Sequence, residues 1–193
     1  LNNTFSKFKG SLSGKTIENQ FIGESSGLIS GWKYNDYQFD TLTYHLDLTD
    51  KNNEIFHLKG NNTIGDTILF SAEKDKSGNV FVSALSGIIK QNNLFVEPFY
   101  INKRNGYYHF PQINISLDEG EVVLQGNYIG KHHYDIDINI YNLNLTNLYS
   151  ITGKNSRLNG YVKSAIINIE RNMEHLLPNP VIFTSLQIEN GHL

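Results

Sequence analysis

Residues 134–141 read YDIDINIY, a stretch in which isoleucine alternates with aspartate or asparagine. Successive side chains of a β-strand point to opposite faces of the sheet, so residues two apart share a face. In a strand, the three isoleucines therefore form an aliphatic face, and the Asp and Asn side chains form a polar one. A helix would mix these residue types around its surface. The stretch predicts a β-strand with one apolar and one polar face.

A period of two recurs along much of the chain. Turn signals such as Asp75 to Asn79 and Lys90 to Asn93 separate the alternating segments. Asn105-Gly106 is a strong hairpin signal. The connections are too short for crossover helices, so neighbouring strands should be antiparallel. The expected strands cover residues 5–12, 39–48, 54–60, 67–73, 80–89, 94–102, 112–117, 122–129, 134–141, 157–162 and 180–191. The pattern is typical of an all-β sandwich, barrel or extended repeat sheet.

Three segments depart from this rhythm. Leu145, Leu148 and Tyr149 have helical spacing, which predicts one short helical segment near residues 143–150. Residues 170–177 precede two prolines and are interpreted as a helical turn or crossing loop. Residues 1–34 are the least regular, and their glycines at 23, 27 and 31 are interpreted as turn and bulge positions.

Composition excludes several classes of function. The net charge of -3 with mixed signs argues against a nucleic-acid surface. The absence of cysteine excludes disulfides and Cys-ligated metal. The sequence has no signal peptide and no apolar run of the ~18 residues that a membrane helix needs. Because the chain begins at Leu1 rather than Met, we expect a fragment of a longer protein, in which anchors and signals could lie elsewhere.

Motifs for catalysis are missing from the sequence. It contains no G-x-S-x-G, no H-E-x-x-H and no phosphate-binding glycine loop. Asp135 and Asp137 share a strand face and could bind calcium or act as an acid pair; a solvated polar face is the alternative. His132 and His133 could bind metal, but adjacent strand residues point opposite ways, and the alternative is a polar turn. We expect no enzymatic activity, no catalytic residue, no cofactor and no metal site.

The order of elements after residue 107 resembles a known family. Strand 134–141 is followed by the apolar segment 142–151, a loop at Thr152 to Asn155, and a strand that enters through Leu158-Asn159-Gly160. Val122 to Tyr128 fits the preceding strand, and Pro180 to Gly191 fits the following one. This order resembles the repeat unit of the TamB and AsmA-like proteins, bacterial relatives of the bridge-like lipid-transfer proteins. The likeness covers residues 107–193, and the first half shares only the rhythm.

The resemblance implies a fold and a function. Residues 1–193 would form a single β-groove domain, part of a larger protein that spans the periplasm. Its long, strongly twisted antiparallel sheet would curl into an open hydrophobic groove. Phospholipid acyl chains would slide along this groove between the inner and outer membranes, without enzymatic chemistry. The expected groove lining is Ile113, Ile115, Leu117, Ile136, Ile138, Ile140, Leu158, Val162, Ile182, Leu186 and Ile188. Leu145, Leu148 and Tyr149 would cap one edge.

The resemblance also implies a cellular context. The parent protein would be anchored in the inner membrane and would assist assembly of outer-membrane proteins with a barrel partner. That partner would be bound through parts outside this chain.

The residues alone leave other folds and functions open. The alternating pattern equally fits a closed core between two layers. A surface adhesin or carbohydrate-binding β-protein would show exposed Tyr or Trp near Asp and Asn, and Tyr37, Tyr107 and Tyr108 keep it open. An outer-membrane barrel would gather aromatics at strand ends. A β-helix enzyme would need carboxylates on adjacent rungs, which the pattern does not provide.

Overall fold

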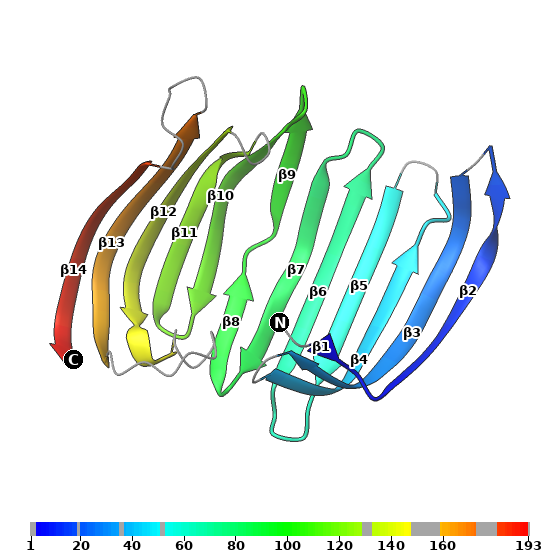
Figure 1. Cartoon of the computed structure of the whole chain (residues 1–193), viewed down its shortest axis with the longest axis horizontal. Helices are drawn as coiled ribbons and strands as arrows, with labels where there is room; N and C mark the ends of the chain where they lie inside the picture. The colour runs from blue at the N-terminus through cyan, green and yellow to red at the C-terminus, as the bar shows by residue number, and fades with distance from the viewer. Residues whose placement is uncertain are drawn as a thin grey trace. The chain divides into compact units, whose positions relative to one another are not determined.

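The computed structural model describes residues 3–18, 20–34, 37–50, 53–128, 133–147, 159–172 and 181–192. The chain divides into two compact units, Leu1–Asn93 and Leu94–Leu193. Almost all described residues lie in β-strands, and every strand pairing within each unit is antiparallel (Figure 1). The predicted all-β, antiparallel fold class is confirmed.

Unit 1 is a sheet in which, apart from the first short strand, consecutive strands of the sequence are hydrogen-bonded neighbours. Its strands are β1 (Asn3–Thr4), β2 (Lys7–Ile17), β3 (Gln20–Tyr34), β4 (Tyr37–Asp47), β5 (Asn53–Asn61), β6 (Thr67–Asp75) and β7 (Val80–Ile89). Strands β1 and β2 both pair with β3, and β4 to β7 follow in order. This meander needs only short turns between antiparallel neighbours, as the turn signals predict.

Unit 2 is built in the same way. Its strands are β8 (Asn92–Val96), which begins at the unit boundary, β9 (Phe99–Arg104), β10 (Tyr107–Leu117), β11 (Gly120–Tyr128), β12 (His133–Asn144), β13 (Asn159–Asn172) and β14 (Val181–His192). Strands β8 and β9 pair with the two ends of β10, and β11 to β14 follow in order. Strands β12 to β14 bend in the same sense along their length (Figure 1). Strand β14 pairs only with β13 among the described strands.

Each unit is a single layer. Every pair of strands that makes substantial contact in the described part of the chain is a hydrogen-bonded pair. A sandwich would add substantial contacts between strands of two facing sheets, and the described residues of unit 1 and of unit 2 show no such pair of strands. Burial in each unit therefore comes from neighbouring side chains on the same sheet face.

The hairpin predicted at Asn105-Gly106 is confirmed. Arg104 lies opposite Tyr107 across the turn. Asn105 and Gly106 both have positive φ, 47° and 84°. Two positive φ angles in a two-residue loop define the type I′ turn, which Asn-Gly favours because both residues tolerate the left-handed region.

Several predicted boundaries were wrong. The single strand expected at 94–102 is two strands, β8 and β9, because Pro98 has no N–H to continue the ladder. Residues 143 and 144 belong to β12, and the helical turn begins at Leu145; residues 148–150 lie outside the described part. Residues 170–172 are the end of β13 rather than a loop or helical turn.

The first 34 residues are more regular than their sequence indicates. Strand β3 runs for 15 residues, and Gly23 and Gly27 lie in its interior opposite Gly14 and Gly10 of β2. A Cβ on Gly23 would stand 2.8 Å from the Cζ atom of the Phe21 ring. The paired glycines therefore leave space that the rings of Phe21 and Tyr44 and the facing backbone approach closely. Of the three predicted glycines, Gly31 has the positive φ, 61°, that is typical of a bulge.

Candidate functional site

The main candidate site is the apolar face of unit 2. Directly paired residues of neighbouring strands point to the same side of a sheet. Ile115 pairs with Val122, Val122 with Ile140, Ile140 with Ala165, and Ala165 with Leu186, which forms one continuous apolar row. The next row along the strands runs through Ile113, Leu124, Ile138 and Ile167. We call the side of unit 2 that carries these rows the apolar face.

The structure brings most of the predicted lining residues together. Ile113, Ile115, Leu117, Ile136, Ile138, Ile140, Val162, Ile182, Leu186 and Ile188 all lie on the apolar face. Leu158 lies outside the described residues. The face also contains apolar residues that were not predicted from the sequence: Leu94, Val122, Leu124, Leu143, Ala165, Ile167 and Ile169. The alternation at 122–124 and 165–169 was a usable signal for most of them.

Two irregularities keep the end of the face apolar. Asn142 has a φ of 49°, and the register of β13 against β14 shifts between Val162 and Ser164. An extra residue in a strand reverses the alternation beyond it. Leu143 and Val162 consequently lie on the same side as Ile140 and pack with it.

Burial varies strongly across the apolar face. Leu143 is 1% exposed and Ala165 3%, and they form a compact cluster with Leu117 and Val162. Leu94, Val122, Ile140 and Leu145 pack against this cluster, which we call the buried end. On β14, by contrast, Ile182 is 56% and Leu186 59% exposed. Soluble monomers rarely expose large contiguous apolar patches, and such patches mark binding surfaces.

Of the predicted capping residues, only Leu145 can be placed. It packs against the buried end, as a cap would. Leu148 and Tyr149 lie outside the described residues.

The opposite face of unit 2 is mainly polar around Asp137, although Val123, Ile166 and Phe183 also lie on it. Asp137 accepts hydrogen bonds from the side-chain amides of Gln125 on β11 and Asn168 on β13. Neutral amides satisfy this carboxylate on both sides, so the geometry is that of a polar ladder across strands. Asp135 pairs with Glu170 further along the same face. Across the described ranges, no group of three or more His, Asp or Glu side chains is placed to hold a metal ion. His133 begins β12, and His132 lies outside the described part.

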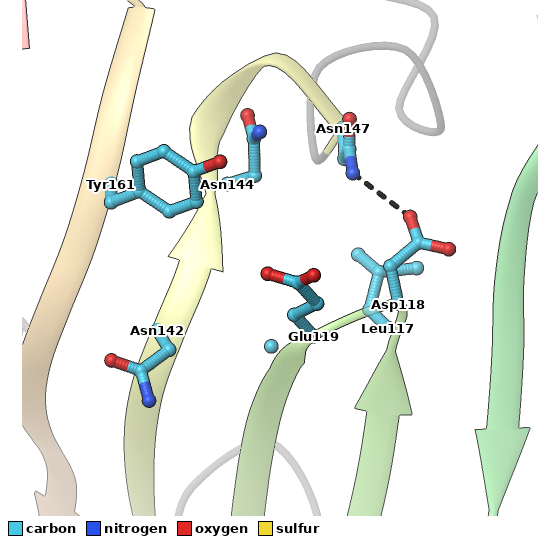
Figure 2. A pocket seen from close by; sticks show the side chains of 8 residues that line it. Leu117, Asp118, Glu119, Asn142, Asn144, Asn147 and Tyr161 are labelled. Carbon is cyan, nitrogen blue, oxygen red and sulfur yellow. Dashed lines mark hydrogen bonds between the residues drawn. The ribbon is translucent and has the colours of Figure 1, made fainter.

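A polar pocket lies at the end of β12, beside the buried end (Figure 2). It encloses about 220 Å³ and is lined by Leu117, Asp118, Glu119, Gly120, Asn142, Asn144, Asn147 and Tyr161. The Asn147 side-chain amide donates a hydrogen bond of 2.8 Å to Asp118, and Glu119 points into the space between them and Asn142 (Figure 2). Tyr161 forms one wall and is 43% exposed. Amides, carboxylates and an exposed aromatic ring can together bind a polyhydroxylated ligand.

Unit 1 has an apolar face of its own, richer in aromatic residues. Tyr44 pairs with Leu58, Leu58 with Phe70, and Phe70 with Leu85. The Phe8 and Tyr44 rings stack with centroids 6.1 Å apart. This face is also part of a single-layer sheet, so unit 1 offers a second apolar surface.

The other face of unit 1 carries a polar row across four strands. The His45 and His57 rings stack at 6.3 Å, His57 Nδ1 lies 2.8 Å from Ser71 Oγ, and Ser83 Oγ donates to Ser71 Oγ at 2.9 Å. A serine nucleophile needs a histidine that is itself oriented by a third polar group. Here the neighbour of the His57 ring on β4 is another imidazole, stacked rather than hydrogen-bonded in its plane. The row is a cross-strand ladder, without the geometry of a nucleophilic triad.

A second pocket, of about 310 Å³, lies at the β5–β6 loop of unit 1. Asp40 and Asp66 organise this loop. Asp40 accepts the Thr63 N–H at 2.6 Å, and this hydrogen bond holds the pKa of Asp40 below its usual value. Asp66 is 6% exposed and accepts the backbone N–H of Lys90 at 2.6 Å. Both carboxylates are used to hold the loop, so the pocket follows from loop folding.

Comparison with known proteins does not assign this chain. No family model, no curated protein and no solved structure matches it. Within the described ranges, no helix has the length and apolar character needed to cross a membrane.

Proposed function

We propose that the apolar face of unit 2 binds the acyl chains of phospholipids and that the protein is a non-enzymatic lipid-conducting groove. The single observation that carries this proposal is a continuous apolar row over five strands, which no second layer covers among the described residues of unit 2. An aliphatic surface of this kind suits hydrocarbon chains better than a polar or rigid ligand.

The energetics favour movement over tight fixation. Burial of one methylene is worth about 0.8 kcal/mol. The rows through Ile138 and Ile140 offer similar aliphatic contacts from one strand to the next. A chain that moves across the strands would therefore exchange one set of contacts for an equivalent set. The aromatic-rich apolar face of unit 1 supports the same role.

The cellular role is proposed from the likeness to the TamB and AsmA-like proteins. It would be phospholipid movement between inner and outer membranes, assistance to outer-membrane protein assembly, or both. The location would be the periplasm, with the parent protein anchored in the inner membrane. An outer-membrane barrel assembly protein would be a partner through parts outside this chain.

Site-specific photocrosslinking in bacterial cells tests the proposal. A photoreactive residue at Ile138 lies on the apolar face, and the matched control at Asp137 lies on the polar face of the same strand. We expect lipid adducts at position 138 and none at position 137. Equal labelling at both positions, or none at either in a folded chain, would contradict lipid binding on this face.

A carbohydrate-binding role is the second candidate, and the pocket of Figure 2 favours it. Tyr161, Asn144 and Asp118 supply a ring, an amide and a carboxylate around one space. Binding of this class is tested with a glycan array and the Tyr161→Ala variant. A glycan signal that Tyr161→Ala abolishes would favour the adhesin alternative over lipid transport.

A further inference from the structure

A row of tyrosines crosses the sheet of unit 2. Tyr108 of β10 pairs with Tyr128 of β11, Tyr128 pairs with Tyr134 of β12, and Tyr134 pairs with Arg171 of β13. On the other side, Lys103 of β9 pairs with Tyr108, and its Nζ atom lies 5.9 Å from the centroid of that ring. We call these five residues the tyrosine row. It is a continuous band with a cation at each end.

The tyrosine row lies on the apolar face. Tyr134 is two residues before Ile136, and Arg171 is two residues after Ile169, so their side chains share the side of the isoleucines. His109 and Asn127 alternate with the row and bond each other on the polar face. The row therefore borders the aliphatic surface.

The row and the buried end occupy opposite ends of the strands. From Tyr134 to Ile140 the strand advances six residues, which is about 20 Å at the usual rise. Ile140 packs against the buried end around Leu143. The apolar face is thus closed at one end by packed side chains and bordered at the other by phenols and cations.

The charges at the two ends are opposite in sign. Lys103 and Arg171 border the row, whereas the turn at the other end carries Asp118 and Glu119. The nearest carboxylates to the row on β12 and β13, Asp135 and Glu170, pair on the polar face. An amphiphile with an anionic headgroup would therefore be attracted to the row and repelled from the buried end.

The side-chain chemistry matches a phosphate between water and hydrocarbon. Tyrosine presents an apolar ring and a polar hydroxyl, which suits such a boundary. Arg and Lys form charge-assisted hydrogen bonds to phosphate, and these are stronger than neutral ones. We propose that the apolar face of unit 2 takes an anionic phospholipid, with its phosphate at the tyrosine row and its acyl chains directed toward Leu143. This inference rests on the proposed lipid function and adds the headgroup class and the orientation.

The row also suits transport. It runs across the strands, from β9 to β13, at right angles to the acyl chain direction. A headgroup can move from one strand to the next without leaving the band, while the chains stay on the aliphatic rows.

A binding comparison tests the headgroup preference. The probes are phosphatidylglycerol and phosphatidylcholine with identical acyl chains, measured against the whole chain by equilibrium binding. We expect phosphatidylglycerol to bind about five- to tenfold more tightly, and Lys103→Gln and Arg171→Gln each to remove most of that preference. Lys103 is exposed, so its replacement leaves the fold intact even where Arg171→Gln unfolds the chain. Arg171→Lys should retain the preference.

The matched control is Arg104→Gln. Arg104 is the next residue of β9 and is exposed, but it points to the other face. It removes the same charge from the same end of the sheet and should leave the preference unchanged. If neither lipid binds, the proposed function itself fails. If both bind equally, or if Arg104→Gln lowers the preference as much as Lys103→Gln, the headgroup assignment is overturned and acyl binding stands.

Photoreactive lipids test the orientation. Phosphatidylglycerol with a diazirine at the acyl terminus should label β12 near Ile140, and a headgroup-labelled analogue should label it near Tyr134, as located by peptide mass spectrometry. The reverse pattern, or even labelling by both probes, would overturn the orientation.

Discussion

The side chain of Leu143 lies against Gly120, so that a Cβ on Gly120 would stand 2.9 Å from Leu143 Cδ1 and 3.0 Å from Leu143 Cα. Leu143 is the most deeply buried side chain among the described residues. It reaches that position because β12 is irregular at Asn142. The close contact between Gly120 and Leu143 thus joins the β10–β11 hairpin to the end of β12.

Two substitutions test this contact. Leu143→Ala should lower the free energy of unfolding by about 2–5 kcal/mol, because it leaves a cavity in the cluster. Gly120→Ala should lower it by about 1–3 kcal/mol, because backbone as well as side chain must move. Urea unfolding measures both. Ile64→Ala, at a side chain that is 78% exposed, is the control and should change stability by less than about 0.5 kcal/mol. Equal effects at positions 64 and 143 would refute the assigned core.

The type I′ turn makes a second prediction. Gly106→Ala should destabilise the hairpin by about 1–2 kcal/mol, because a side chain at a φ of 84° is strained. Asn105→Gly should be tolerated, since glycine adopts positive φ freely. Thermal and urea unfolding distinguish the two variants. A stable Gly106→Ala protein would mean that the turn has another conformation.

Asp75 makes stability depend on pH. The Asn79 side-chain amide donates to it at 2.7 Å, and this bond is the main cause that holds the pKa of Asp75 below its usual value. The stabilisation is therefore present above the unfolded pKa of about 3.9 and is lost as pH falls through the lower folded pKa. Urea unfolding of wild type and Asp75→Asn should differ at pH 7, and the difference should shrink at about pH 3. A difference that is the same at both pH values would exclude this linkage.

Asp66 should be important for the β5–β6 loop. Its carboxylate accepts the Lys90 N–H at 2.6 Å and the Asn62 side-chain amide at 3.1 Å. Asp66→Ala removes the acceptor of both donors and should cost about 1–3 kcal/mol. Asp50→Ala, at an exposed turn, is the matched carboxylate control. Loss of amide protection at Lys90 in hydrogen exchange would identify the cause.

Local pattern was sufficient to predict the fold class and one face of the site. Ile136, Ile138 and Ile140 share a face because alternation is a property of the strand itself. The Asn-Gly turn was predictable for the same reason, since its backbone preference is local. Neither prediction needed knowledge of which strand lies next to which.

Other features depend on pairing between distant residues and were not predictable. The irregularity at Asn142 breaks the alternation and resembles the start of a helix, although Leu143 continues β12. Gly23 resembles a turn residue until it is seen opposite Gly14. The tyrosine row requires the register of five strands, because nothing in the sequence places Tyr108 near Tyr134.

In a single-layer sheet, folding cooperativity comes only from the contacts between adjacent strands. Each strand of unit 2 relies on its immediate neighbours, as in proteins whose stability is nearly one-dimensional. Among the described strands, β14 pairs with β13 alone, so in this chain it should detach at a fraction of the free energy needed to release β12. The exposed isoleucines of β14 therefore lie on a strand that should open readily. Under the proposed function, an acyl chain would enter the apolar face there, at the edge of the described sheet.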